Sequence, residues 1–162
     1  MSPNRNLALA LLLPLAACGG KSKDDTGGSG SSSATVCIDE DLGNEVNYEM
    51  AAGSTEGDDF QVGTCGDSQV GTDSADYGYT WTAPASAGYT FTTAGSSFNT
   101  VLAILDGDCN GAVLACNDDL SFDNQDSEIY IKLVEGQKIV IVVDGYDVYQ
   151  SGAYELHVLQ DI

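Results

Sequence analysis

Alternation of apolar and polar residues with a period of two is the feature that most restricts the fold of this chain. Because successive side chains of an extended strand point to opposite sides, such alternation is typical of a strand with one buried face. Continuous apolar runs are typical of central strands that are buried on both faces. Alternation occurs in residues 77–82, 89–92, 129–133 and 154–159, and continuous runs occur in residues 101–105 and 139–143.

Turn-forming residues separate these stretches, and no convincing helical period appears. Gly, Asp, Ser and Pro cluster in residues 84–88, 94–97, 106–108, 135–137 and 144–145. Many short strands at regular spacing indicate a β-sandwich. Residues 40–76 are less regular, and we expect two or three short strands there, around 46–50 and 60–62. The sequence therefore predicts an all-β domain of about eight or nine antiparallel strands.

The first 17 residues predict a cleaved export signal. Arg5 precedes an apolar segment that is far shorter than the roughly 20 residues of a transmembrane helix. The segment ends in Leu15-Ala16-Ala17-Cys18, which resembles the lipobox of bacterial lipoproteins. That resemblance implies cleavage before Cys18 and attachment of a diacylglyceryl group to its thiol. The alternatives are an ordinary secretory signal followed by a chance cysteine, and a buried helix.

The chain then divides into a tether and one domain. Residues 18–35 begin with the lipidated cysteine and continue as a Gly/Ser-rich segment, a composition that behaves as a flexible coil. Residues 36–162 are enough for one domain with a real core. Because two acyl chains anchor a protein more firmly than one, we expect stable attachment to a membrane. Gly19 stands where some bacteria place an Asp that retains lipoproteins in the inner membrane, so the outer membrane is favoured.

The charge balance is strongly acidic and excludes one class of partner. The chain has 25 Asp and Glu residues against 5 Lys and Arg residues. Such a surface repels phosphate backbones, so we exclude binding to nucleic acid. It is compatible with export, with solubility and with cation binding. The alternative is that most of these carboxylates are only a solvated surface.

Four cysteines follow Cys18, and an even number in an exported domain predicts disulfides. Three pairings are possible. Proximity in the sequence favours Cys37–Cys65 and Cys109–Cys116, and the second pair brackets a turn. A zinc site is the alternative, although the chain has no CxxC motif and a single histidine.

A series of short motifs follows in order between Tyr79 and Leu159. They are 81–84 (WTAP), 88–91 (GYTF), 95–102 (GSSFNTVL), 109–111 (CNG), 114–119 (LACNDD), 142–146 (VVDGY) and 152–156 (GAYEL). With them the folded part resembles the bacterial pre-peptidase C-terminal domain, in the disulfide-bearing form common in exported proteins of myxobacteria and their relatives. This resemblance implies a jelly-roll-like β-sandwich that is not catalytic and has a binding, targeting or secretion role. Some related collagen-binding domains bind calcium.

The resemblance brings four polar residues near one another as a possible calcium site: Asn99, Asp118, Asp119 and Asp144. Calcium takes six to eight oxygen ligands, which loop carboxylates and carbonyls supply. The family usually has Asp at the position of Asn99, so this chain carries one charge less there. The alternative is that Asp and Asn only stabilise turns by bonding to nearby backbone amides.

Three aromatic residues are candidates for ligand binding: Phe122, Tyr146 and Tyr149. They fall in expected loops, where rings can stack on sugars or anchor a peptide. Most other aromatic residues occupy the apolar phase of a strand and are expected in the core. The alternative for the three is that single exposed rings are common and carry no function.

No catalytic constellation is recognisable. His157 is the only histidine and falls on the outward phase of the last strand, so we expect it at the surface. We therefore predict a lipid-anchored envelope protein that is not an enzyme and that binds a glycan or a protein, with calcium as its only expected cofactor. The alternatives are a purely structural lipoprotein and a small hydrolase that uses a pair of carboxylates.

Overall fold

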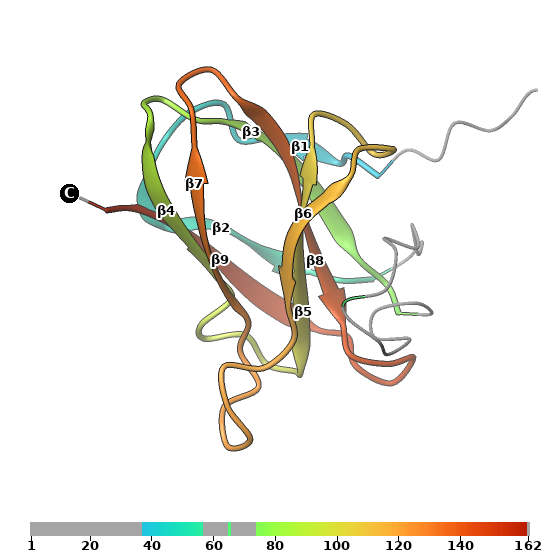
Figure 1. Cartoon of the computed structure of the whole chain (residues 1–162). Helices are drawn as coiled ribbons and strands as arrows, with labels where there is room; N and C mark the ends of the chain where they lie inside the picture. Colours follow the sequence, from blue (N-terminus) through green and yellow to red (C-terminus); the bar gives the residue numbers. More distant parts are fainter. Residues whose placement is uncertain (1–36, 57–64, 66–73, 162) are drawn as a thin grey trace, which may run out of the picture. The chain divides into compact units, whose positions relative to one another are not determined.

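The computed structural model describes residues 37–56, 65 and 74–161, which form a sandwich of two β-sheets (Figure 1). Within these residues there are strands and no helix, so no described helix could span a membrane. The predicted signal, Cys18, the tether and the strand expected at 60–62 lie outside the described residues. The strands are β1 (Glu40–Asp41), β2 (Asn47–Ser54), β3 (Tyr77–Thr82), β4 (Ala87–Thr92), β5 (Thr100–Asp106), β6 (Val113–Asn117), β7 (Glu128–Leu133), β8 (Lys138–Gly145) and β9 (Ala153–Gln160).

The strand order is that of a jelly roll. One sheet has the order β1-β3-β8-β5-β6, and the other has the order β2-β9-β4-β7. The eight strands β2 to β9 pair antiparallel within the two sheets, as in double-sheet jelly rolls. The predicted β-sandwich is confirmed. The two-residue strand β1 is an additional edge strand that pairs with β3 in parallel.

The core lies between the inner faces of the two sheets. Trp81 of β3 is fully buried and meets the rings of Tyr89 and Phe91 of β4 edge to face, with centroid distances of 5.0 and 5.5 Å. Its indole nitrogen donates a hydrogen bond of 2.7 Å to the carbonyl oxygen of Glu45. The alternation in β3 and β4 therefore has a simple cause, since the apolar residues of each strand face the opposite sheet.

A second, smaller apolar cluster covers the outer face of the first sheet. Ile139, Ile141 and Val143 of β8 enter the central core, whereas Val140 and Val142 point outward and pack with Cys37. The segment at Cys37 crosses so close to β3 that a Cβ on Gly78 would lie 1.7 Å from the Cys37 carbonyl oxygen. The continuous apolar run of β8 is thus explained by burial on both faces.

The predicted disulfide pairing is wrong. The structure forms Cys37–Cys109 and Cys65–Cys116, with sequence separations of 72 and 51 residues, instead of Cys37–Cys65 and Cys109–Cys116. Cys116 lies within β6 opposite Ala103 of β5, while Cys109 lies in the turn that joins these two strands. Each sulfur therefore meets a segment that comes from an earlier part of the chain. Proximity in the sequence does not reveal this, because the partners are brought together by the sheet.

The expectation for His157 is also wrong, because its side chain is fully buried. Its Nδ1 accepts a hydrogen bond of 2.7 Å from the Glu49 backbone N–H, and its Nε2 lies 2.8 Å from the Ala94 carbonyl oxygen. Its ring stacks on the Tyr48 ring with a centroid distance of 4.2 Å. The outward phase was predicted correctly. The side chain is covered because β2 is irregular between Asn47 and Ala51, where Glu49 has a φ of 65°.

Candidate functional site

Three connections meet at one end of the sandwich, at the bottom of Figure 1, and we call this region the loop end. It consists of residues 93–99 between β4 and β5, residues 118–127 between β6 and β7, and residues 146–152 between β8 and β9. They meet because β5 begins where β6 and β8 end, as the pairs Val101↔Asp144 and Leu102↔Asn117 show. Antiparallel pairing alone therefore gathers these segments.

Hydrogen bonds join the three loops into one surface. Asn99 is central, because its N–H donates to Gln150 Oε1 at 3.1 Å and its carbonyl accepts from the Tyr146 N–H at 3.1 Å. The neighbouring Thr100 N–H donates to the Gln125 carbonyl at 3.2 Å. The Ser127 hydroxyl lies 2.7 Å from the Thr100 carbonyl oxygen and 2.6 Å from the Asp118 carbonyl oxygen. These bonds hold the loop end in a preformed arrangement.

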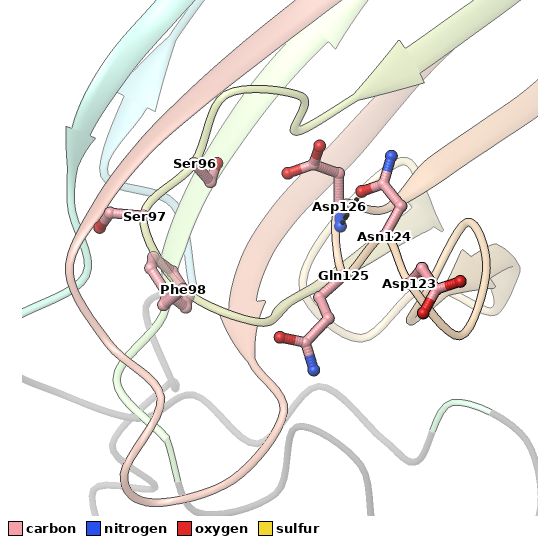
Figure 2. A pocket seen from close by; sticks show the side chains of 7 residues that line it. All are labelled: Ser96, Ser97, Phe98, Asp123, Asn124, Gln125 and Asp126. Atoms are coloured by element: carbon pink, nitrogen blue, oxygen red, sulfur yellow. Dashed lines mark hydrogen bonds between the residues drawn. The ribbon is translucent and has the colours of Figure 1, made fainter.

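A hollow of about 260 Å³ opens between two of these loops. Figure 2 shows the residues of the β4–β5 loop on one side and those of the β6–β7 loop on the other. Within the second loop, the Asp126 N–H donates to Asn124 Oδ1 at 3.0 Å. The hollow is polar and acidic, with room for one long side chain rather than for a large ligand. Its lining is Ser96, Ser97, Phe98, Asp123, Asn124, Gln125 and Asp126.

The three candidate aromatic residues all belong to the loop end. Phe122 lies in the β6–β7 loop and is 97% exposed, while Tyr149 in the β8–β9 loop is 88% exposed. These are the largest exposed fractions among the large hydrophobic residues that the structure describes. Tyr146 is 41% exposed and joins the β8–β9 loop to Asn99. The structure brings the three into one region, and their role in binding remains a prediction.

Hydrogen bonds hold both exposed rings in defined turns. Ser121 and Asn124 exchange two backbone hydrogen bonds of 3.1 and 2.9 Å, which place Phe122 at the tip of a tight turn. The Tyr149 N–H donates to Asp147 Oδ1 at 2.8 Å, an arrangement in which an aspartate side chain closes a turn. Side chains on such turns lose little backbone entropy when they bind a partner.

The four residues of the possible calcium site also lie at this end. Asn99 and Asp144 are almost fully buried, and Asp144 Oδ1 accepts from the Gly145 N–H at 2.6 Å. In the described part of the chain, Oδ1 of Asn99, Asp118 and Asp119 is buried without a hydrogen-bond partner. Burial, and then the charge of Asp119, raises the pKa of the Asp118 carboxyl above its ordinary value.

These unsatisfied oxygens are compatible with a bound cation, because buried acceptors without donors are costly. The chemistry of the set is limited, however. Among residues 37–56, 65 and 74–161, no three His, Cys, Asp or Glu side chains lie close enough together to hold a metal ion. Two carboxylates and the Asn99 amide would therefore need backbone carbonyls and water to complete the six to eight ligands of calcium.

The sequence did not indicate several residues that organise the loop end. Gln125, Gln150 and Ser127 hold the loops together through hydrogen bonds. They belong to turn-rich segments, which were recognisable as loops. Which loops meet depends on the order of strands in the sheet, and no local pattern in the sequence contains that order.

The sequence matches no protein-family model and no curated protein. Two solved structures are similar in fold. The pre-peptidase C-terminal domain of collagenase from Bacillus anthracis has a TM-score of 0.49 at 17% identity, covering 75% of this chain and 95% of that domain. A periplasmic inhibitor of g-type lysozyme from Aeromonas hydrophila has a TM-score of 0.43 at 16% identity, covering 75% of this chain and 99% of the inhibitor. Neither likeness assigns an activity or a ligand to this chain.

Proposed function

We propose that this protein is an exported, lipid-anchored binding module of the bacterial envelope that has no catalytic activity and uses the loop end to hold a glycan or a protein. One observation carries the binding role. The two most exposed large hydrophobic side chains of the described residues, Phe122 and Tyr149, project from hydrogen-bonded turns at the same end of the sandwich. Aromatic side chains are enriched where proteins bind partners, because they bury much area at a small cost in entropy.

The membrane location rests on the N-terminal residues. A diacylglyceryl group on Cys18, joined by an N-acyl chain, would anchor the protein stably, and the Gly/Ser-rich segment would give the domain reach. Gly19 after the cysteine favours the outer membrane. This arrangement would present the folded domain to partners.

Replacement of Cys18 by serine should abolish lipidation of the protein. The full chain, expressed in a bacterial host, is expected in the membrane fraction with a lipid on Cys18. C18S should carry no lipid, because serine has no thiol to accept it, and C18S without residues 1–17 should be in the soluble fraction. Mass spectrometry of the mature N-terminus supplies the independent readout. Recovery of the unsubstituted chain in the soluble fraction with an unmodified Cys18 would refute the anchor.

Calcium is proposed as the ion that stabilises the loop end. The Asp118 pKa is raised on folding, so the stability that a protonated Asp118 contributes is present below the unfolded pKa and is lost as the pH rises. Above the folded pKa the ionised carboxylate is therefore destabilising relative to the protonated one. A cation held by Asp118, Asp119 and Asn99 would offset the repulsion and supply the unsatisfied oxygens with a partner.

Calcium at 100 times its dissociation constant should raise the free energy of unfolding of C18S without residues 1–17 by about 2.7 kcal/mol. Asp118→Asn should lose this increase, and in chelator it should be more stable than its parent because it removes a buried charge and, with it, the repulsion with Asp119. Thermal unfolding at fixed ionic strength measures both effects, with Glu135→Gln, an exposed carboxylate in the β7–β8 turn, as the control. An equal increase in stability with magnesium in place of calcium would contradict the site. The same increase with calcium in Asp118→Asn would also contradict it.

A further inference from the structure

We infer that the partner of the loop end is a cationic polypeptide, a protein surface or segment rich in Arg and Lys, rather than a glycan. This inference rests on the binding role proposed above and specifies the chemistry of the partner. Three features of the loop end carry it: the sign of its charge, the position of its carboxylates beside exposed rings, and the acidic hollow between two of its loops.

The loop end carries acidic charge without a compensating base. The three loops contain five aspartates, at positions 118, 119, 123, 126 and 147, and no Lys, Arg or His. The opposite end is acidic as well, but it also holds both lysines of residues 36–162, since Lys138 begins β8 and Lys132 is near the end of β7. An uncompensated acidic field attracts a cationic partner and raises its association rate, whereas a neutral glycan gains nothing from it.

Each exposed ring has a carboxylate in its own turn. Asp123 follows Phe122 at the tip of the β6–β7 turn, and the Asp147 side chain closes the turn that carries Tyr149. A guanidinium or ammonium group can lie over an aromatic face while its N–H groups donate to a neighbouring carboxylate. Arginine suits this pairing best, because its planar guanidinium group can stack on a ring while its N–H groups donate to a carboxylate.

The hollow supplies a third contact of the same kind. Asp123 and Asp126 line it from one loop and Phe98 from the other, so its walls combine carboxylates with an aromatic ring (Figure 2). One long basic side chain would fit there. The proposed calcium ligands are Asn99, Asp118 and Asp119, which do not line this hollow, so the surface stays acidic when the ion is bound.

A fluorescent peptide of alternating Arg and Gly tests the inference on C18S without residues 1–17, with an uncharged Ser-Gly peptide and a chitin oligosaccharide as the other probes. Fluorescence anisotropy should show binding of the Arg-Gly peptide alone, with an affinity that falls as salt is added. Phe122→Ala with Tyr149→Ala leaves the net charge unchanged and should weaken binding about tenfold. Tyr130→Ala should leave binding unchanged, because this exposed ring lies over Gly88 on the outer face of the β2-β9-β4-β7 sheet, away from the loop end.

A charge-matched pair of variants separates a specific surface from general attraction to an acidic protein. Asp123→Asn with Asp126→Asn should weaken binding more than Glu135→Gln with Asp161→Asn, which removes the same charge from the opposite end. Equal weakening by the two pairs, or unchanged binding after loss of both rings, would overturn the inference. Ring-dependent binding of the oligosaccharide instead of the peptide would also overturn it, yet would support the proposed binding role. If no probe binds in a ring-dependent manner, both fail.

Discussion

Replacing Cys37 and Cys109 by serine should lower the free energy of unfolding by about 4 kcal/mol. The bond joins residues 72 positions apart, so it closes a long loop and restricts the unfolded chain strongly. It also ties the segment at Cys37 onto Val140 and Val142. Loss of the bond would therefore release the segment that covers the outer apolar cluster. It would also give the unfolded chain more conformational freedom.

Denaturant unfolding of the oxidised proteins measures this loss. Cys65→Ser with Cys116→Ser is the matched comparison, and it should cost slightly less because its separation is 51 residues. Peptide mapping of the unsubstituted protein checks the connectivity directly. A peptide that links Cys109 to Cys116 would contradict the structure, as would a double variant of Cys37 and Cys109 that unfolds like the parent.

Trp81→Ala should cost about 3 to 5 kcal/mol of stability, the range found when a buried aromatic side chain is truncated. Trp81 is fully buried between Tyr89 and Phe91, so alanine leaves a cavity between the two sheets. It also removes the hydrogen bond from the Trp81 indole nitrogen to the Glu45 carbonyl oxygen.

Far-UV circular dichroism is the suitable readout, because Trp81 is the only tryptophan and its fluorescence is lost in the variant. Tyr130→Ala serves as the control, since this ring is 56% exposed and should cost under about 1 kcal/mol. Trp81→Phe keeps most of the volume and should fall between the two. A loss in Trp81→Ala no larger than in Tyr130→Ala would show that Trp81 does not support the core.

Hydrogen bonds of Ser127 hold the candidate calcium ligand Asp118 within the loop end. The Ser127 hydroxyl lies close to the carbonyl oxygens of both Thr100 and Asp118, which holds the start of β5 beside the end of β6. The burial of the Oδ1 atoms of Asn99 and Asp118 is therefore a consequence of strand pairing. A cation there would stabilise the loops that carry Phe122 and Tyr149.

Local patterns of apolar and polar residues were enough to predict the class of fold and the positions of most strands. Alternation in β3, β4, β7 and β9 is a local property, because each residue's neighbours two positions away share its face. The double burial of β8 was likewise readable from its unbroken apolar run. The loop character of the segments that carry Phe122 and Tyr149 followed from their turn-forming residues.

Which segments meet depends on how the strands are arranged in the folded domain. The pairing of Cys37 with Cys109 depends on a segment that crosses β3, and the burial of His157 depends on an irregularity in β2. The loop end exists because β5, β6 and β8 are neighbours in one sheet. These contacts join residues that are far apart in the chain, and their energies depend on how two sheets pack, so no local periodicity contains them.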